Sequence, residues 1–331
     1  MKASIMSHRA RLQACLAGDT LDRPPVALWR HFPVDDQTPD GLAAASVYFQ
    51  NSFDFDLIKV TPTSSFCIKD WGVRDRWTGN PEGTRDYTER VVHHAEDWAA
   101  LRVLEPDQGH LGAQIECLKL INAAFLQETP VIQTIFSPMS QAKNLAGPDN
   151  LLIQMRQNPE ALHAGLQRIT ETTIRFLEAA IKTGIDGIFY AIQHAQYGLL
   201  SEAEFEAFCR PYDLKILKAA SGLWLNMLHL HGSAVMFDAV LDYPSAVINW
   251  HDRETFPSLH EALARSEGAV CGGLRQWETM VLGTPEQVRI EAKDAIAQTD
   301  GQRFILGTGC VLPTTAPYGN IMAARRAVEE I

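Results

Sequence analysis

The feature that most constrains the fold of this chain is a regular alternation of short apolar runs with longer amphipathic stretches. Each run is rich in β-branched and aromatic residues, and the stretch after it spaces its apolar residues as a helix does. Residues 284–301, for example, begin with a Thr suited to capping a helix and end on a Gly. The eight predicted strands are residues 25–29, 56–60, 130–135, 187–192, 223–230, 246–250, 269–274 and 303–308.

Eight strands that alternate with helices predict an α/β fold, a single (β/α)8 TIM barrel. An open, doubly wound sheet is the alternative, but closing the barrel removes the exposed edges that an open sheet leaves. We assign residues 1–331 to this one domain. The segment 62–129 is too long for a simple connection, so we expect an insertion after the second strand that elaborates the barrel mouth.

Charge and composition narrow the classes of function. The formal net charge of −11, with no block of Lys and Arg, argues against binding to nucleic acid or to a membrane surface. No apolar window approaches the roughly 20 residues that span a bilayer, and the N-terminus lacks the apolar core of a signal peptide. We therefore expect a cytoplasmic protein. In that compartment the six scattered cysteines should be free thiols.

Polar residues gather where the predicted strands end. In barrels of this kind the catalytic side chains lie at the C-terminal ends of the strands, where the βα loops converge. These residues are therefore the candidates for a functional site. They are Arg30, His31, Lys59, Tyr190, Gln193, His194, His229, His231, His251, Asp252, Arg275 and Cys310.

Three of these candidates could bind a metal ion. His229 and His231 are two residues apart on a predicted strand, so their side chains point to the same side. Cys310 follows glycines that would let its thiolate approach them. Two imidazoles and a thiolate suit zinc, and a catalytic zinc site needs three protein ligands. The alternative is that the histidines make ordinary buried hydrogen bonds and that the thiol packs as a small apolar group.

The remaining candidates have chemical roles and simpler alternatives. Cationic side chains at strand ends could hold an anion, although Lys59 could also be an ordinary paired charge. His251 and Asp252 could form an acid/base pair, or could only hold a loop together. Tyr190 and His194 could bracket a substrate, but Tyr190 alone is typical of a core residue.

Four segments of the chain resemble the uroporphyrinogen decarboxylase superfamily. Residues 129–147 are similar to the strand-three segment of that family, and residues 199–217 to the Ser-x-x-x-Phe…Pro-Tyr helix after strand four. Residues 282–296 and 304–330 resemble the last two units, the terminal segment most specifically. The resemblance covers nearly the whole chain, and it implies a (β/α)8 barrel with a cleft at the C-terminal ends of the strands.

The superfamily has two chemical branches. Its decarboxylases use an Arg-rich N-terminal motif, an Asp that contacts the pyrrole nitrogens, and a His in a Gly-His-Gly turn. Where the Arg-rich motif is expected, this sequence has only Arg30, and where the His of the Gly-His-Gly turn is expected, it has Thr308. Its zinc-dependent methyltransferases have ligands that resemble His-x-Cys and a distant Cys after Gly, and here these positions hold His229, His231 and Cys310. Imidazole in place of the central thiolate would leave the ion a stronger Lewis acid.

The first functional hypothesis is therefore a zinc-dependent methyltransferase. It would move a methyl group between a small substrate and a corrinoid or thiol acceptor, and any corrinoid would reside on a separate carrier protein. Substrate binding is assigned to Arg30, His31, Lys59, Gln193 and Arg275, and proton handling or orientation to His251, Asp252, His194 and Tyr190. The resemblance also implies a homodimer. The alternatives are decarboxylation of a tetrapyrrole or another polycarboxylate, and a non-catalytic binding barrel.

Overall fold

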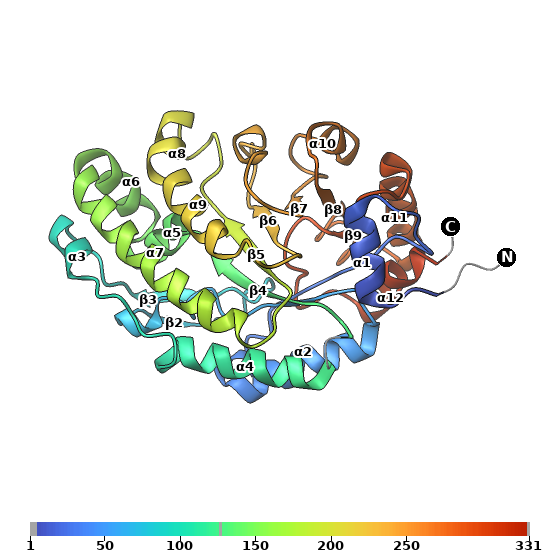
Figure 1. Cartoon of the computed structure of the whole chain (residues 1–331), viewed down its shortest axis with the longest axis horizontal. Coiled ribbons are helices and arrows are strands. Elements are labelled where there is room, and N and C mark those ends of the chain that lie inside the picture. The colour runs from blue at the N-terminus through green and yellow to red at the C-terminus, as the bar shows by residue number, and fades with distance from the viewer. Residues whose placement is uncertain (1–4, 126–127, 330–331) are drawn as a thin grey trace.

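The main sheet is curled and has seven parallel strands in the order β1-β4-β5-β6-β7-β8-β9 (Figure 1). The computed structural model describes residues 5–125 and 128–329. The strands alternate with helices along the chain, as the apolar pattern predicted. The strands of this sheet are β1 (Ile58–Val60), β4 (Val131–Phe136), β5 (Gly187–Ile192), β6 (Met227–Leu230), β7 (Val247–Trp250), β8 (Ala269–Leu274) and β9 (Phe304–Thr308).

Helices surround the strands on the outside (Figure 1). Ser and Thr side chains cap many of them, and Thr284 caps α11 as its sequence predicted. Within the described part of the chain, no helix is both long and apolar enough to cross a membrane. The helices are α1 (His8–Ala17), α2 (Pro39–Phe53), α3 (Ala95–Ala100), α4 (Gly109–Phe125), α5 (Pro138–Ala146), α6 (Pro148–Gln157), α7 (Pro159–Ile181), α8 (Glu202–Phe208), α9 (Arg210–Ala219), α10 (Leu259–Arg265), α11 (Pro285–Thr299) and α12 (Tyr318–Ala327).

The predicted first strand, residues 25–29, is not formed as a strand. Its one β-bridge joins Val26 to Leu306 of β9 in parallel, and Val26 also accepts a backbone hydrogen bond from Asp56, just before β1. Pro24 and Pro25 have no N–H to donate, so a continuous ladder cannot form here. Both edges of the sheet are thus linked to this segment, but the sheet itself has seven strands and not the eight predicted.

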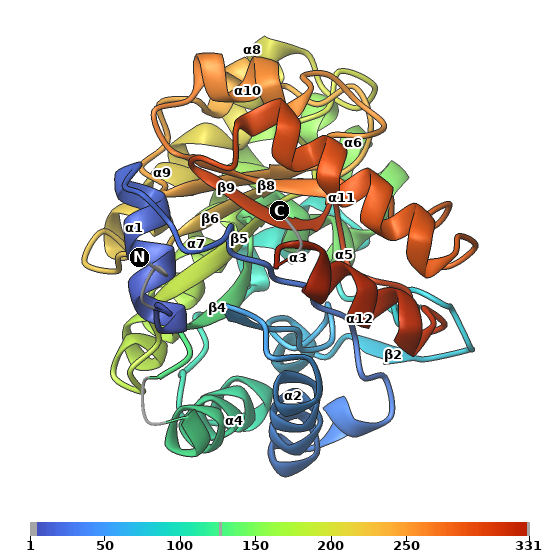
Figure 2. The same ribbon diagram turned by 90° about the vertical axis from the view of Figure 1, so that its right-hand side faces the viewer.

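The long segment between β1 and β4 has two parts. Its second part, α4, packs against α2 and α7 as part of the helical layer, and Figure 2 shows α2 and α4 side by side. Its first part contains the antiparallel pair β2 (Arg74–Arg76) and β3 (Asp86–Glu89). The α4 helix is therefore an ordinary crossover helix rather than an inserted element.

The loop between β2 and β3 reaches segments that follow the last strands. Thr314, beyond β9, donates its backbone N–H and its hydroxyl to the carbonyl of Pro81. The Glu82 carboxylate accepts hydrogen bonds from the side chains of Gln276 and Trp277, which follow β8. This loop therefore lies at the C-terminal side of the strands.

At the opposite end, buried charges pair with one another around Asp56. This carboxylate is fully buried and accepts hydrogen bonds from Arg11 at 2.6 Å, from Arg23 at 2.7 Å and from the backbone N–H of Val26 at 2.8 Å. His8 lies 3.0 Å away. Burial opposes ionisation, but the hydrogen bonds from His8, Arg23 and Arg11 hold the pKa of Asp56 well below its usual range. The network joins α1 to the start of the sheet.

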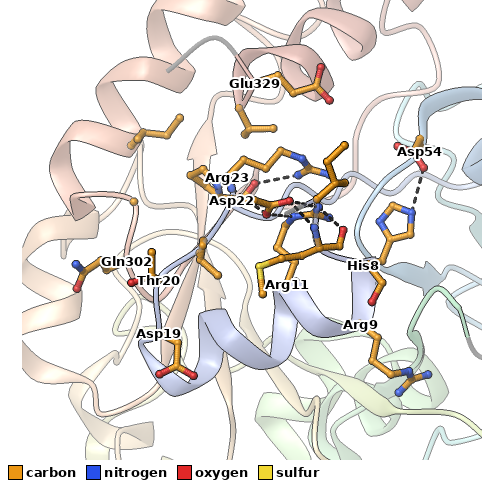
Figure 3. A pocket seen from close by; sticks show the side chains of 18 of the residues that line it. His8, Arg9, Arg11, Asp19, Thr20, Asp22, Arg23, Asp54, Gln302 and Glu329 are labelled. Carbon is orange, nitrogen blue, oxygen red and sulfur yellow. Dashed lines mark hydrogen bonds and ion pairs between the residues drawn. The ribbon is translucent and has the colours of Figure 1, made fainter. Parts of the chain in front are cut away.

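A cavity of about 1170 Å³ lies beside this network, and Figure 3 shows side chains that line it. It lies at the N-terminal ends of the strands, and the charged side chains drawn there largely pair with one another. In barrels this face serves stability, and catalysis takes place at the other face. We therefore assign the cavity no catalytic role.

We expect Asp56→Asn to lower the free energy of unfolding by about 3–5 kcal/mol, because it leaves two buried arginines without their shared counter-charge. Denaturant titration measures the change. Glu116→Gln, which breaks an exposed pair with Lys119 on α4, is the control and should change stability little. Equal losses in the two variants would contradict a central role for Asp56.

Candidate metal centre

Four potential metal ligands converge at the C-terminal ends of the last strands. His229 lies in β6, His231 just after it, His251 directly after β7 and Cys310 two residues after β9. One donor atom from each side chain lies within 4.8 Å of all the others. We call this group the His3Cys cluster. Its spacing is compatible with one bound ion.

Strand register explains why the histidines meet. In the parallel pair β6–β7, His229 lies opposite Asn249 and Leu230 opposite Trp250. The next pair in that register is His231 and His251, whose ring centroids are 5.4 Å apart. The sequence predicted His229 and His231 as ligands and His251 as an acid/base group. Aligning the ends of these two strands is the signal that would have added His251 to the ligand set.

Cys310 reaches the histidines because residue 309 is a glycine. Its Sγ lies 3.6 Å from Nδ1 of His231 and 3.8 Å from Nε2 of His229. A Cβ at Gly309 would lie 2.7 Å from the Cα of His251 and 2.9 Å from the carbonyl oxygen of Trp250. Any side chain there would push the segment away from β7. The predicted role of the glycines in this turn is therefore consistent with the geometry.

Asn249 orients His229. Its Nδ2 donates to the carbonyls of Cys271 at 2.9 Å and Thr308 at 3.0 Å, so its Oδ1 must face Nδ1 of His229, 2.7 Å away. An oxygen at this position accepts a hydrogen bond from Nδ1–H, which keeps the proton on Nδ1 and leaves the lone pair of Nε2 free. Nε2 is the atom that faces Cys310, as a metal ligand would. Such partners commonly fix the tautomer of a ligating histidine.

Burial keeps the imidazoles neutral. It lowers the pKa of His229 well below its usual value, and it lowers the pKa of His231 to about 4, with help from His251 and Lys143. Neutral imidazole is the form that binds metals. Nε2 of His251 is buried and has no hydrogen-bond partner among the described residues, and its Nδ1 lies 3.3 Å from Glu254. An unpaired buried lone pair of this kind fits a ligand atom.

The thiol of Cys310 needs a cation to ionise. Burial raises its pKa to about 12. A bound divalent ion would deprotonate it, because metal coordination favours the thiolate. Three nitrogens and one sulfur are a donor set that zinc accepts in tetrahedral geometry. The residues present therefore fit a zinc ion.

Lys59 and His31 face the same interior as the cluster. The Nζ of Lys59 lies 4.5 Å from the ring centroid of Phe189, which stacks on His229 at 5.0 Å. Burial lowers the pKa of Lys59 to about 7. His31 is buried, and its Nδ1 has no partner in the described chain. Its pKa falls to about 3, first through burial and then through the charges of Lys59 and Arg85.

A lysine that sequence reasoning missed lies beside Gln193 and His194. Lys143 of α5 donates to the Gln193 side chain at 2.7 Å. Burial lowers the pKa of Lys143 to about 8. Burial also lowers the pKa of His194 to about 3, and the Lys143 charge adds to that shift. No strand-end pattern marks a helical lysine, so only the packing of α5 beside the β5 loop identifies it.

Two predicted site residues point away from the cluster. Tyr190 follows Phe189 on β5, so it faces the helices, where its hydroxyl donates to Asp213 of α9 at 2.5 Å. Arg275 donates to Glu291 of α11 through its backbone and its side chain. Strand alternation places Tyr190 on the outer side, and Arg275, which lies beyond the end of β8, is turned toward α11. The predicted roles in substrate orientation and anion binding do not fit these positions.

Arg30 and Asp252 are also engaged elsewhere. The guanidinium of Arg30 lies over the rings of Phe32 and Phe49, 5.2 and 5.8 Å from their centroids. It also donates to the carbonyl of Thr314. Asp252 accepts from the backbone N–H of Gly273, and burial raises its pKa to about 7. His251 contacts Glu254, so the predicted His251–Asp252 pair is not formed.

The amino-acid sequence matches a known protein family. A sequence profile described as uroporphyrinogen decarboxylase (URO-D) matches residues 7–331. The chain belongs to the URO-D family. Within that family it is similar to the methylcobamide:CoM methyltransferases MtbA of Methanosarcina acetivorans and Methanosarcina mazei, with 24% and 25% identity. Both alignments cover 70% of this chain and 67% of the relative.

Uroporphyrinogen decarboxylases match this chain with comparable identity but with less significant alignments. Uroporphyrinogen decarboxylase of Syntrophotalea carbinolica is 26% identical over 69% of this chain and 68% of its own. Among solved structures, a methyltransferase from Methanosarcina mazei superposes with a TM-score of 0.87 at 18% identity, covering 98% of this chain and 99% of that one. The fold of this URO-D protein is thus that of a known methyltransferase structure, and the sequence lies nearer the methyltransferase branch.

Replacing Asn249 tests whether its side chain prepares the site for a metal. We expect Asn249→Ala to weaken binding of added Zn²⁺ by about ten- to a hundredfold, the usual effect of removing such a partner, because His229 loses its fixed tautomer. Competition with a chromophoric chelator measures the affinity. Asn226→Ala is the control, since it removes a buried amide of the same kind bonded to Ala220 and Ile188. An equal loss in both variants would contradict the specific role.

Proposed function

We propose that this protein is a zinc-dependent methyltransferase that moves a methyl group between a small substrate and a corrinoid or thiol acceptor. The observation that supports it most is the His3Cys cluster, four neutral or ionisable donors gathered within 4.8 Å at the functional end of the strands. The sequence similarity to methylcobamide:CoM methyltransferases supports the reaction class. Any corrinoid would be carried by a separate protein.

His229, His231 and Cys310 would hold the ion, and His251 would stand at the remaining position. Zinc in such a site supplies a Lewis acid that polarises the heteroatom bearing the methyl group. With one thiolate and neutral imidazoles, the ligand set carries little negative charge, which favours the binding of a heteroatom from the substrate. Through its unpaired Nε2, His251 would bind the ion or, where the substrate takes that position, accept a hydrogen bond from a hydroxyl or thiol of the substrate.

The chain prepares this geometry before any ligand binds. Asn249 points Nε2 of His229 toward the thiol, and Gly309 lets the segment carrying Cys310 approach β7. Because these groups are buried, water is largely excluded from them, and charge interactions there are strong. The active geometry therefore needs little rearrangement of the protein.

Decarboxylation of a polycarboxylate has less support. The decarboxylases carry an Arg-rich motif where this sequence has only Arg30, and Arg275 is paired with Glu291. A purely structural role for the His3Cys cluster also has less support, because it would leave Nε2 of His251 buried and unpaired. A bound zinc ion would be a partner for both this nitrogen and the thiol of Cys310.

Zinc content of variants tests the ligand set. We expect about one zinc per chain in the wild type, and loss of most of it in His231→Ala and Cys310→Ser, because three ligands hold the ion. His251→Ala should retain zinc with lower affinity. His260→Ala, on an exposed face, and Cys15→Ser, a buried thiol that contacts Phe304, are matched controls. Elemental analysis after dialysis gives the content.

Co²⁺ substitution adds a spectroscopic check. A thiolate–Co²⁺ charge-transfer band that disappears in Cys310→Ser would identify the sulfur as a ligand. A wild-type protein without stoichiometric metal, or variants that keep it, would refute the proposal. Unfolding curves of the variants separate loss of the metal from loss of the fold.

Methyl transfer is tested with free cofactor. Zinc-loaded protein is mixed with methylcobalamin and a panel of small thiols, and demethylation is followed by the change in the cobalamin spectrum. We expect turnover with at least one acceptor and at least a tenfold lower rate in His231→Ala, because the acceptor heteroatom is no longer activated. Decarboxylation of uroporphyrinogen by the wild type, without demethylation, would replace this function with the alternative.

A further inference from the structure

We propose that the loop between β2 and β3, residues 77–85, is a gate that opens to admit a substrate to the His3Cys cluster. We call these residues the mouth loop and residues 79–83 its tip. The Glu82 carboxylate and the Pro81 carbonyl hold the tip closed in this structure. The inference goes beyond the proposed function, because it concerns access to the cluster and holds with or without a bound metal ion.

The His3Cys cluster has little room for a substrate. His229 and Cys310 are only 4% and 9% exposed, and the side chain of His251 is 10% exposed. His231 is half-buried. His251 and Gly309 line a cavity of about 10 Å³, which holds at most one water molecule. A substrate that reaches the cluster therefore has to displace part of the chain above it.

The mouth loop is bonded to the segments that follow two neighbouring strands. After β8, Gln276 and Trp277 donate to the Glu82 carboxylate at 3.0 and 3.2 Å. After β9, Thr314 donates its backbone N–H and its hydroxyl to the carbonyl of Pro81, at 2.6 and 2.9 Å. The loop therefore crosses the mouth over the ends of β8 and β9.

The tip of this loop lies over the cluster. The negative charge of Glu82 is close enough to act on both Cys310 and His251. Its hydrogen-bond partner Gln276 lines the same small cavity as His251 and Gly309. The bond between Glu82 and Gln276 thus closes the space directly beside the cluster, and its opening would enlarge that space.

Glycines allow the tip to turn while the base of the loop stays fixed. At the base, Arg85 donates to the carboxylate of Asp36 at 2.5 Å. The tip begins at Gly79 and ends at Gly83, whose φ angles of +95° and +76° suit glycine alone. Between them, the carbonyl of Asn80 accepts a bond from the N–H of Gly83 at 2.9 Å and keeps the tip folded. The tip can therefore move as one unit about hinges at its ends.

Water can replace the bonds that hold the tip. The contact between Thr314 and Pro81 is exposed, and the two bonds to Glu82 are partly buried. Opening exchanges these bonds for bonds to water, so its net cost is small. The ion pair at the base differs, because the side chains of Arg85 and Asp36 are 5% and 0% exposed, and separating them would strand two buried charges. Opening is therefore confined to the tip.

Alkylation of Cys310 measures how often the gate opens. Metal-free protein is treated with iodoacetamide, and labelled peptides are quantified by mass spectrometry. We expect Glu82→Ala to label Cys310 about tenfold faster than the wild type, because the loss of one or two bonds shifts the opening equilibrium by that order. Cys15 and Cys271, both fully buried, should label as slowly as in the wild type. Parallel acceleration at all three thiols would mean general loosening and would refute the gate.

Two further variants separate opening from a charge effect. Glu254→Ala is the matched control and should change labelling little, because the charge of Glu254 also acts on Cys310 but its contact is with His251. Gln276→Ala combined with Trp277→Phe keeps the Glu82 charge and removes both bonds to it, so it should accelerate labelling as Glu82→Ala does. Acceleration in Glu82→Ala and Glu254→Ala without acceleration in the double variant would overturn the proposal.

Hydrogen exchange of the Thr314 amide gives an independent readout of the same movement. This N–H donates to Pro81 and is released when the tip opens. In Glu82→Ala it should exchange about tenfold faster, in step with Cys310 labelling, while the amides of β8 and β9 keep their wild-type rates. Unchanged exchange at Thr314 would contradict a moving loop. Because all these measurements use protein without metal, a failure of the proposed zinc site would leave them decisive.

Discussion

The side-chain amide of Asn249 ties together the strands on which the site depends. From β7 it contacts His229 on β6 and donates to carbonyls of Cys271 on β8 and Thr308 on β9. Both N–H groups and the oxygen are used inside the curled sheet, where an unpaired amide would be costly. The same three bonds therefore hold the strands in place, fix the histidine tautomer and set the position from which Cys310 turns inward.

The two ends of the strands handle buried charge in opposite ways. At the N-terminal end, Asp56 gathers several cations and every group has a partner, which stabilises the junction of α1 with the sheet. At the C-terminal end, Nε2 of His251, Nδ1 of His194 and Nδ1 of His31 are buried without partners in the described chain. A protein retains such groups where a ligand will satisfy them, and this contrast identifies the functional end more clearly than cavity size does.

The sequence predicted much of the site, and the errors of that prediction lie at the ends of the strands. His229, His231 and Cys310 were correctly expected to come together, because two-residue spacing on a strand and a glycine turn are local properties. Tyr190 and Arg275 were placed at the mouth because they lie near strand ends, but Tyr190 alternates to the outer face of β5, and Arg275, beyond the end of β8, pairs with Glu291 of α11. A shift of one residue in a strand reverses the face of each side chain, so uncertain boundaries prevent this assignment. Three features were found only in the structure: Lys143, Asn249 and the position of His251 among the ligands.

The sequence by itself determined three things: the order of strands and helices, the free thiols of the cysteines and the pair of histidines on one strand. These follow from periodicity and residue chemistry over a few neighbouring positions. The tertiary structure decided which distant groups meet: the register that places His251 beside His231, and the packing that brings Lys143 to Gln193. It also reduced the predicted first strand to one bridge, since Pro24 and Pro25 have no N–H to donate and the N–H of Val26 goes to the Asp56 carboxylate. Register and side-chain pairing depend on contacts between residues far apart in the chain, and no local pattern encodes them.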